Sequence, residues 1–370
     1  MGARTFSVSS YREARVSRGV VEDEHVTRVA EQTARETGKL KPTVDPSVDV
    51  IRRSLLRFNQ TDDGYTVTIG CPMNVEESTD TTGSMGGNVD VNMGVLPDTY
   101  DLLSQVLPGY DLQLALGIFG DVCDRFPLQR PQFEMTAETI VEYLTDFVPE
   151  RKGGDTPEDP QYSMFAAAYL TDAYTNRIGL KGYYFVTSDA PIHNRISEDQ
   201  LIRIFGKDVF KKLTENGNQI DKNSLPTPSE VAHALKKRMH TFFLQVGRQN
   251  DATECWIRLF GADRVIHLPD VHYKPHVQAV IVGLTEGILQ LSEVEDFLVK
   301  NNLTESMARK ITQSVSCIPL GEQAKLLEKL EHPLPKPGDV FASKTDLWPV
   351  SYAEDIPEEK KEDEGPEGWL

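Results

Sequence analysis

The chain has 370 residues, and its 39 Lys and Arg against 57 Asp and Glu give a formal net charge of −18 at pH 7. This acidity argues against a nucleic-acid-binding protein, because phosphate contacts need a basic face, and against a polybasic binder of membrane surfaces. No apolar run approaches the roughly 20 residues of a spanning helix, and the first residues lack a secretory h-region. Four isolated cysteines show no zinc-ligand spacing and suit a reducing compartment. We therefore expect a cytoplasmic protein that binds neither nucleic acid nor membrane.

Residues 1–62 are interpreted as a polar N-terminal arm with short helices. Residues 1–20 hold four arginines and one glutamate, which is typical of a mobile arm or of a basic arm that docks on an acidic surface. The stretch 22–41 predicts a short polar helix that ends near Gly38 and Pro42. With few apolar residues, this helix is expected to be peripheral.

The central block, residues 63–291, alternates strand-like and helix-like segments. Strands are expected over 65–70, 112–120, 182–189, 240–247 and 264–269. Helices are expected over 136–148, 163–174, 229–238, 252–260 and 276–291. This alternation predicts an α/β fold, a doubly wound, mainly parallel sheet with helical N- and C-terminal flanks. Such sheets bind ligands at the carboxyl ends of their strands.

The C-terminal part of the chain changes in composition after residue 291. Residues 292–332 predict two or three charged helices, and Pro333, Pro335 and Pro337 then interrupt the pattern. Residues 333–370 form a proline-containing acidic tail with little apolar periodicity, which we expect to be disordered.

Three polar motifs fall where strands are expected to meet loops: DTTGSMGG at 80–87, GGDTPEDP at 153–160 and TSDAPIH at 187–193. Each motif alone is typical of a turn or a helix cap. The first places Asp80, Thr82 and Ser84 at alternate positions, so that a carboxylate and two hydroxyls can point at one locus. Hard divalent cations such as Mg²⁺ prefer these oxygen ligands.

The order of the three motifs resembles the metal-ion-dependent adhesion site (MIDAS) of von Willebrand factor A (vWA) domains. The variant is similar to a subgroup in hemicentin-like and alpha-kinase-associated vWA domains that reads DTTGSM, GGxDxPE and DAPxH. The resemblance covers residues 63–291 and implies a Rossmann-like sheet with bound Mg²⁺, or Mn²⁺ or Ca²⁺. The metal ligands that it implies are Asp80, Thr82 and Ser84 in the first loop, Thr156 or alternatively Asp155 in the second, and Asp189 in the third, directly or through water.

The resemblance implies a non-enzymatic adaptor in which the metal binds an Asp or Glu side chain of a partner protein. An AAA+ ATPase or a subunit of a larger complex is the expected kind of partner, and residues 276–291 are the part expected to move. One alternative is a structural or assembly component of a large phage or prokaryotic complex that uses its flanking segments. Another is a Mg²⁺-dependent phosphohydrolase with Asp80 as nucleophile, although the lysine and the GDG motif of such enzymes are absent.

One departure from the vWA pattern precedes the first motif. The residues MNVEEST place Glu76 and Glu77 where buried aliphatic side chains are expected. Either the strand is YTVTIG with a linker before the loop, or it runs on with unusual polarity, with a direct metal role for a glutamate as a third reading. Because a buried unpaired carboxylate is costly, we expect early strand termination or an exposed first strand.

A local group of histidines, His267, His272 and His276 around Asp270, could also bind a metal. His267 falls inside an apolar strand pattern and the other two flank a Tyr-Lys-Pro turn. The pattern therefore favours structural or surface roles for all three.

Overall fold

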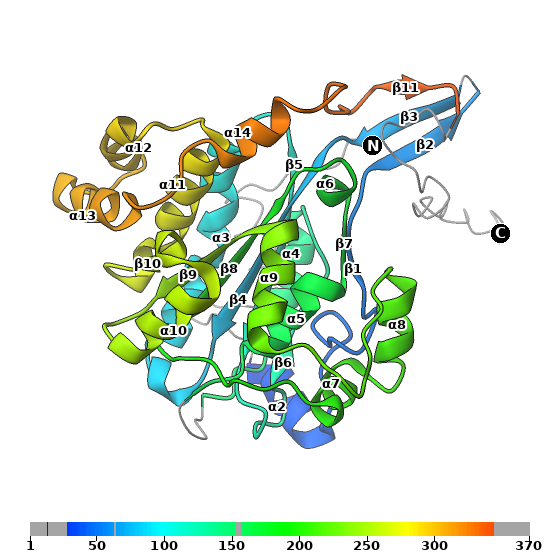
Figure 1. Cartoon of the computed structure of the whole chain (residues 1–370), viewed down its shortest axis with the longest axis vertical. Coiled ribbons are helices and arrows are strands. Elements are labelled where there is room, and N and C mark those ends of the chain that lie inside the picture. Colours follow the sequence, from blue (N-terminus) through cyan, green and yellow to red (C-terminus); the bar gives the residue numbers. More distant parts are fainter. Residues whose placement is uncertain (1–12, 14–27, 63, 152–156, 344–370) are drawn as a thin grey trace, which may run out of the picture.

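The computed structural model describes residues 13, 28–62, 64–151 and 157–343. These residues form a six-stranded sheet in the order β10-β9-β8-β4-β5-β6 (Figure 1). Its strands are β4 (Pro72–Asp80), β5 (Asp111–Phe119), β6 (Leu128–Gln129), β8 (Gly182–Ser188), β9 (Met239–Gln245) and β10 (Val265–His267). All neighbours are parallel except β5 and β6. Numbered along the chain, this is the 3-2-1-4-5-6 order of a doubly wound fold, so the predicted fold class is confirmed.

Helices cover both faces of the sheet (Figure 1). On one face pack α3 (Asn88–Val106), α4 (Ala137–Asp146) and α11 (Lys274–Glu286), and on the other α5 (Gln161–Tyr169), α7 (Glu198–Phe205), α8 (Val209–Glu215), α9 (Pro228–Arg238) and α10 (Asn250–Phe260). The remaining described helices are α2 (Arg28–Thr37), α6 (Tyr174–Arg177), α12 (Val294–Lys300), α13 (Glu305–Val315) and α14 (Glu322–Leu327). No described helix has the length and apolar character needed to cross a membrane.

Most expected elements of the central block are confirmed, with shifted ends. The helix predicted after Thr136 is α4, and the Thr136 side chain accepts a hydrogen bond from the backbone N–H of Thr139, as an N-cap does. The helix expected over 163–174 is shorter than predicted. It ends at Tyr169, and the short strand β7 (Thr171–Ala173) and α6 follow.

The expected early end or exposure of the first strand is wrong. β4 lies in the middle of the sheet, runs directly into Asp80, and is buried at every residue. The YTVTIG segment is a strand, β3 (Gly64–Ile69), but it belongs to a separate three-stranded sheet. Glu76 and Glu77 are tolerated inside the core because each has a buried cationic partner, Arg130 and Lys274 respectively.

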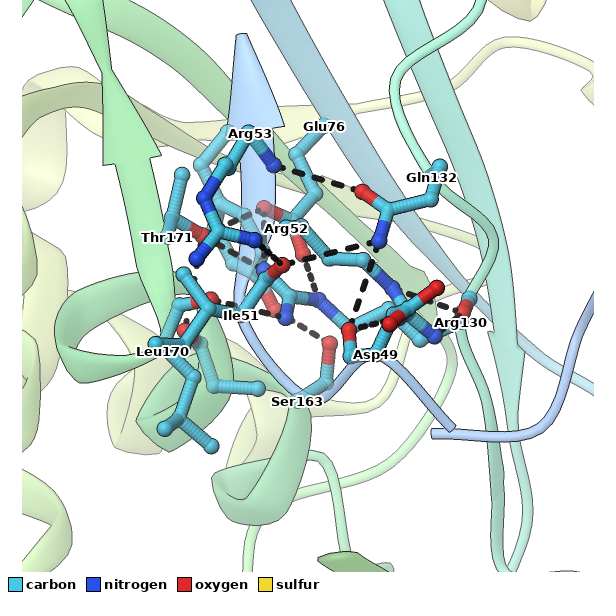
Figure 2. Close-up of polar contacts among 12 residues, drawn as sticks. Asp49, Ile51, Arg52, Arg53, Glu76, Arg130, Gln132, Ser163, Leu170 and Thr171 are labelled. Carbon is cyan, nitrogen blue, oxygen red and sulfur yellow. Dashed lines mark hydrogen bonds and ion pairs between the residues drawn. The ribbon is translucent and has the colours of Figure 1, made fainter. Parts of the chain in front are cut away.

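Glu76 is the acceptor at the centre of a buried network between β4, β6 and the N-terminal flank (Figure 2). The Arg130 Nε and Nη2 atoms lie 2.6 and 3.0 Å from its two carboxylate oxygens. Beside Arg130, the Arg52 guanidinium donates to four backbone carbonyls, those of Arg130, Asp45, Val48 and Asp49. Burial and the charge of Arg130 lower the pKa of Arg52 to about 9. The network therefore holds the segment around Arg52 against the central sheet.

Both flanks pack onto the central domain. β1 (Arg52–Ser54) pairs in parallel with β7, and β2 (Arg57–Thr61) and β11 (Val340–Phe341) pair with β3. Helices α13 and α14 contact α11. Residues 333–343 thus contain a paired strand within the segment expected to be disordered, whereas residues 1–12, 14–27 and 344–370 lie outside the described residues.

A close approach between β4 and β8 depends on Gly182. A Cβ atom at this position would overlap the side-chain amide of Asn74, whose Oδ1 accepts a hydrogen bond of 2.7 Å from Thr175 Oγ1. We expect Gly182→Ala to lower the free energy of unfolding by about 1–3 kcal/mol through overpacking, measured by urea denaturation. The double variant Asn74→Ala/Gly182→Ala should lose less than the sum of the two single variants; additive losses would show that the amide is not what excludes the methyl group.

Candidate metal centre

The first and third motifs meet at the point where the strand order of the sheet reverses. Asp80 is the last residue of β4, and Asp189 follows the last residue of β8. These two strands are parallel neighbours in the centre of the sheet, with β5 and β6 on one side and β9 and β10 on the other. In doubly wound sheets the crevice at this switch point, outside the carboxyl ends of the strands, is where ligands bind.

Four of the predicted ligands form one connected set of hydrogen bonds. Asp80 Oδ1 accepts from the backbone N–H of Thr82 at 2.8 Å and from Thr82 Oγ1 at 2.7 Å. Thr82 Oγ1 lies 3.2 Å from Ser84 Oγ, which donates to Asp189 Oδ1 at 2.8 Å. The structure thus brings Asp80, Thr82, Ser84 and Asp189 together.

Ser188 is a member of this set that the sequence reasoning missed. Its Oγ donates to Asp80 Oδ2 at 2.6 Å and accepts from the backbone N–H of Ala190 at 3.1 Å. The sequence feature that could have identified Ser188 is its position next to Asp189, at the end of an apolar strand. Through Ser188, the carboxylate of the first loop is joined directly to the start of the third.

Burial raises the pKa of Asp80 to about 6. The hydrogen bonds from Ser188 and Thr82 act in the opposite direction, and the negative charge of Asp189 adds to the rise. The buried environment of Asp80 therefore disfavours the ionised form of its carboxylate. A cation bound beside it would offset this penalty, and binding would become weaker below about pH 6 because protons compete for the ligand.

The predicted second-loop ligands, Asp155 and Thr156, lie outside the described residues. The following Glu158 is described and is bonded to the third loop, with its N–H donating to Pro191 O and its C=O accepting from His193 N, each at 2.9 Å. Burial, a hydrogen bond with Asp121 and the charge of Asp80 raise the pKa of Glu158 to about 10. These surroundings favour the protonated form of Glu158, which sequence reasoning did not single out although it belongs to the second motif.

The donor set fits a hard divalent cation. It consists of the carboxylates of Asp80 and Asp189 and the hydroxyls of Thr82 and Ser84, all oxygen atoms of the kind that Mg²⁺, Mn²⁺ and Ca²⁺ prefer. Among the described residues there is no group of three or more His, Cys, Asp and Glu side chains arranged to hold a metal. A site at this position therefore depends on hydroxyl ligands as much as on carboxylates.

The three histidines at and after the end of β10 do not form a metal-binding group among the described residues. His272 Nδ1 lies 2.7 Å from Asp270 Oδ1, whereas His276 Nε2 lies 3.1 Å from the carbonyl of Asn301. These separate contacts agree with the structural reading that the sequence favoured.

The raised pKa of Asp80 predicts that Asp80→Asn stabilises the metal-free protein. A carboxyl whose folded-state pKa lies above its ordinary value of about 3.9 favours folding only while protonated, so stability is lost as pH rises from about 4 to 6. At pH 7.5 we expect the variant to exceed the wild type by up to about 3 kcal/mol. Near pH 4 the two should coincide. Urea unfolding in a chelator across pH 4–8 would test this, and a variant less stable at pH 7.5 would contradict it.

No protein-family model and no curated protein matches this chain. Three similar solved structures are proximal thread matrix protein 1 from the mussel byssus (10% identity, TM-score 0.38), the SpRpn10 VWA domain (11%, 0.36) and the vWF domain of the type V pili tip protein Mfa5 from Porphyromonas gingivalis (11%, 0.37). These alignments cover 58%, 56% and 58% of this chain and 48%, 94% and 95% of the others. The chain thus spans about half the length of the mussel protein.

Proposed function

We propose that this chain is a non-enzymatic protein-binding domain that holds a divalent cation at the carboxyl ends of β4 and β8. The ligands are Asp80, Thr82, Ser84 and Asp189, with Asp155 or Thr156 completing the set from the second loop. The observation that carries the proposal is the continuous hydrogen-bonded set of these described side chains at the switch point of the sheet. The cation is Mg²⁺, or Mn²⁺ or Ca²⁺.

The partner chemistry follows from the charge of the site. The proposed set contains few carboxylates, so a bound divalent cation keeps positive charge for one more oxygen ligand. On a chain of net charge −18, such a cation provides a local attraction for an Asp or Glu side chain of a partner protein. Following the resemblance of the three motifs to vWA domains, we propose a cytoplasmic adaptor role, with an AAA+ ATPase or a subunit of a larger complex as partner.

The hydrolase alternative is not favoured by the residues around Asp80, because the lysine and the GDG motif of phosphohydrolases that use an aspartate nucleophile are absent from the sequence. The assembly alternative requires the flanks to contact other subunits. Their described strands β1 and β11 pair instead with strands of the same chain.

The metal site is tested by calorimetric titration and thermal unfolding with Mg²⁺, Mn²⁺ and Ca²⁺. In the wild type, a bound cation raises stability by mass action, by about 2.7 kcal/mol at 100 times its Kd. Asp80→Asn and Ser84→Ala should abolish the rise. Asp270→Asn is the matched control, because Asp270 is an exposed carboxylate after β10 at the same end of the sheet. Equal responses in Asp80→Asn and Asp270→Asn would exclude a site at Asp80.

The partner chemistry is tested with two pools of synthetic peptides. One pool carries a single Asp or Glu in each peptide, and the other carries Asn or Gln at the same positions. We expect enrichment of the acidic pool on the wild type in the activating metal, and none in chelator or on Asp80→Asn. Enrichment that persists in chelator would rule out a metal bridge.

A further inference from the structure

At the end of the sheet opposite the candidate metal centre lies a cavity of about 390 Å³. Its lining residues come from the amino ends of β8, β9 and β10, from the carboxyl end of α9, and from α14 and the residues just after it. Figure 1 shows α14 at that end of the molecule. They are Lys181, Lys236, Met239, His240, Thr241, Arg264, Glu322, Lys325, Leu326 and Lys329. Five of these side chains are cationic and one is a carboxylate, in a protein whose net charge is −18.

The single carboxylate of the cavity is already engaged. Glu322 forms an ion pair with Arg264 Nη2 and lies 3.4 Å from His240 Nδ1. The His240 contact, followed by Arg264, lowers the pKa of Glu322 to about 2, so it is ionised and paired at neutral pH. Glu322 thus pairs directly with Arg264, and no other carboxylate lines the cavity.

None of the four lysines forms an ion pair with a carboxylate of the described chain. Lys181 Nζ and Lys236 Nζ donate to the backbone carbonyls of Lys236 and Leu259, at 2.7 and 2.8 Å. The side chains of Lys325 and Lys329 on the α14 side are exposed. The cavity thus gathers positive charge that no carboxylate of the described residues pairs with directly.

We propose that this cavity binds a small molecule with two or more phosphate groups. The volume lies in the range of ligand sites, about 300–1,000 Å³. Phosphate oxygens match the ammonium donors of the lysines, and the four lysines supply more positive charge than a single carboxylate or sulfate balances. Met239 and Leu326 provide an apolar wall for the rest of the ligand.

The test is calorimetric titration of the full chain with inorganic pyrophosphate, in buffer freed of metal by a chelating resin so that the candidate metal centre does not contribute. Lys325→Ala/Lys329→Ala should weaken binding at least about tenfold, the equivalent of one lost charged hydrogen bond. Lys300→Ala/Lys310→Ala removes the same charge from exposed positions on α12 and α13 outside the cavity. This control should bind within about twofold of the wild type, since distant exposed charges are screened by salt.

Equal weakening by both lysine pairs would show a general charge effect and overturn the proposal. So would sulfate binding as tightly as pyrophosphate, a hexaglutamate peptide binding more tightly, or no pyrophosphate binding at all.

Discussion

Lys274→Met is expected to lower the free energy of unfolding by about 3–5 kcal/mol, the usual effect of removing one partner from a buried ion pair. Lys274 begins α11, and its Nζ donates to Glu77 inside the core, where both side chains are fully buried. Burial lowers the pKa of Lys274 and the charge of Glu77 raises it. Without the lysine, the Glu77 carboxylate keeps only its bonds from Thr79 (2.6 Å) and Gln278 (2.8 Å). Urea denaturation at pH 7 measures the loss.

The double variant Glu77→Leu/Lys274→Met separates the ion pair from the packing around it. Replacing both charges by apolar groups of similar size is often neutral or stabilising, so the double variant should recover most of the stability that Lys274→Met loses. Lys211→Met is the surface control: Lys211 is 75% exposed beside Glu215 on α8, and its loss should change stability by less than about 1 kcal/mol. If the double variant were as unstable as Lys274→Met, the loss of stability would come from altered packing and not from the unpaired Glu77 carboxylate.

Glu76→Gln is expected to have a similarly large effect, about 3–5 kcal/mol. The variant leaves the guanidinium groups of Arg52 and Arg130 close together in the core without the carboxylate between β4 and β6 (Figure 2). Because Arg52 binds the carbonyls of Asp45, Val48 and Asp49, the effect should reach the N-terminal flank. Urea denaturation gives the magnitude, and limited proteolysis should show faster cleavage near residues 44–56.

A partly exposed ion pair serves as the control for Glu76→Gln. Asp172 and Arg177 lie 2.8 Å apart with 21% and 11% of their side chains exposed. Asp172→Asn should therefore cost less than Glu76→Gln and leave cleavage near residues 44–56 unchanged. If Glu76→Gln had the smaller effect, the Arg52 network would not depend on the carboxylate at its centre.

Local patterns in the sequence determined the fold class and most of the candidate site. Apolar runs such as 112–120 and 182–189 indicate buried strands wherever they occur, because a strand covered on both faces needs apolar side chains along its length. Alternation with helical segments then implies a parallel sheet, and the strand-end position of Asp189 follows from the same pattern. Asp80, Thr82 and Ser84 could be grouped because alternate residues of one short loop are neighbours without any tertiary information.

Only the tertiary structure shows how Glu76 and Glu77 are accommodated in the core. Their partners Arg130 and Lys274 stand 54 and 197 positions away along the chain, and no local rule predicts a pairing over such a distance. The basic cavity is of the same kind: its lysines and Arg264 come from separate elements and converge only when α14 packs beside the amino ends of the strands. Local periodicity reports which face of an element is buried, whereas the compensation of a buried charge depends on residues that only folding brings together.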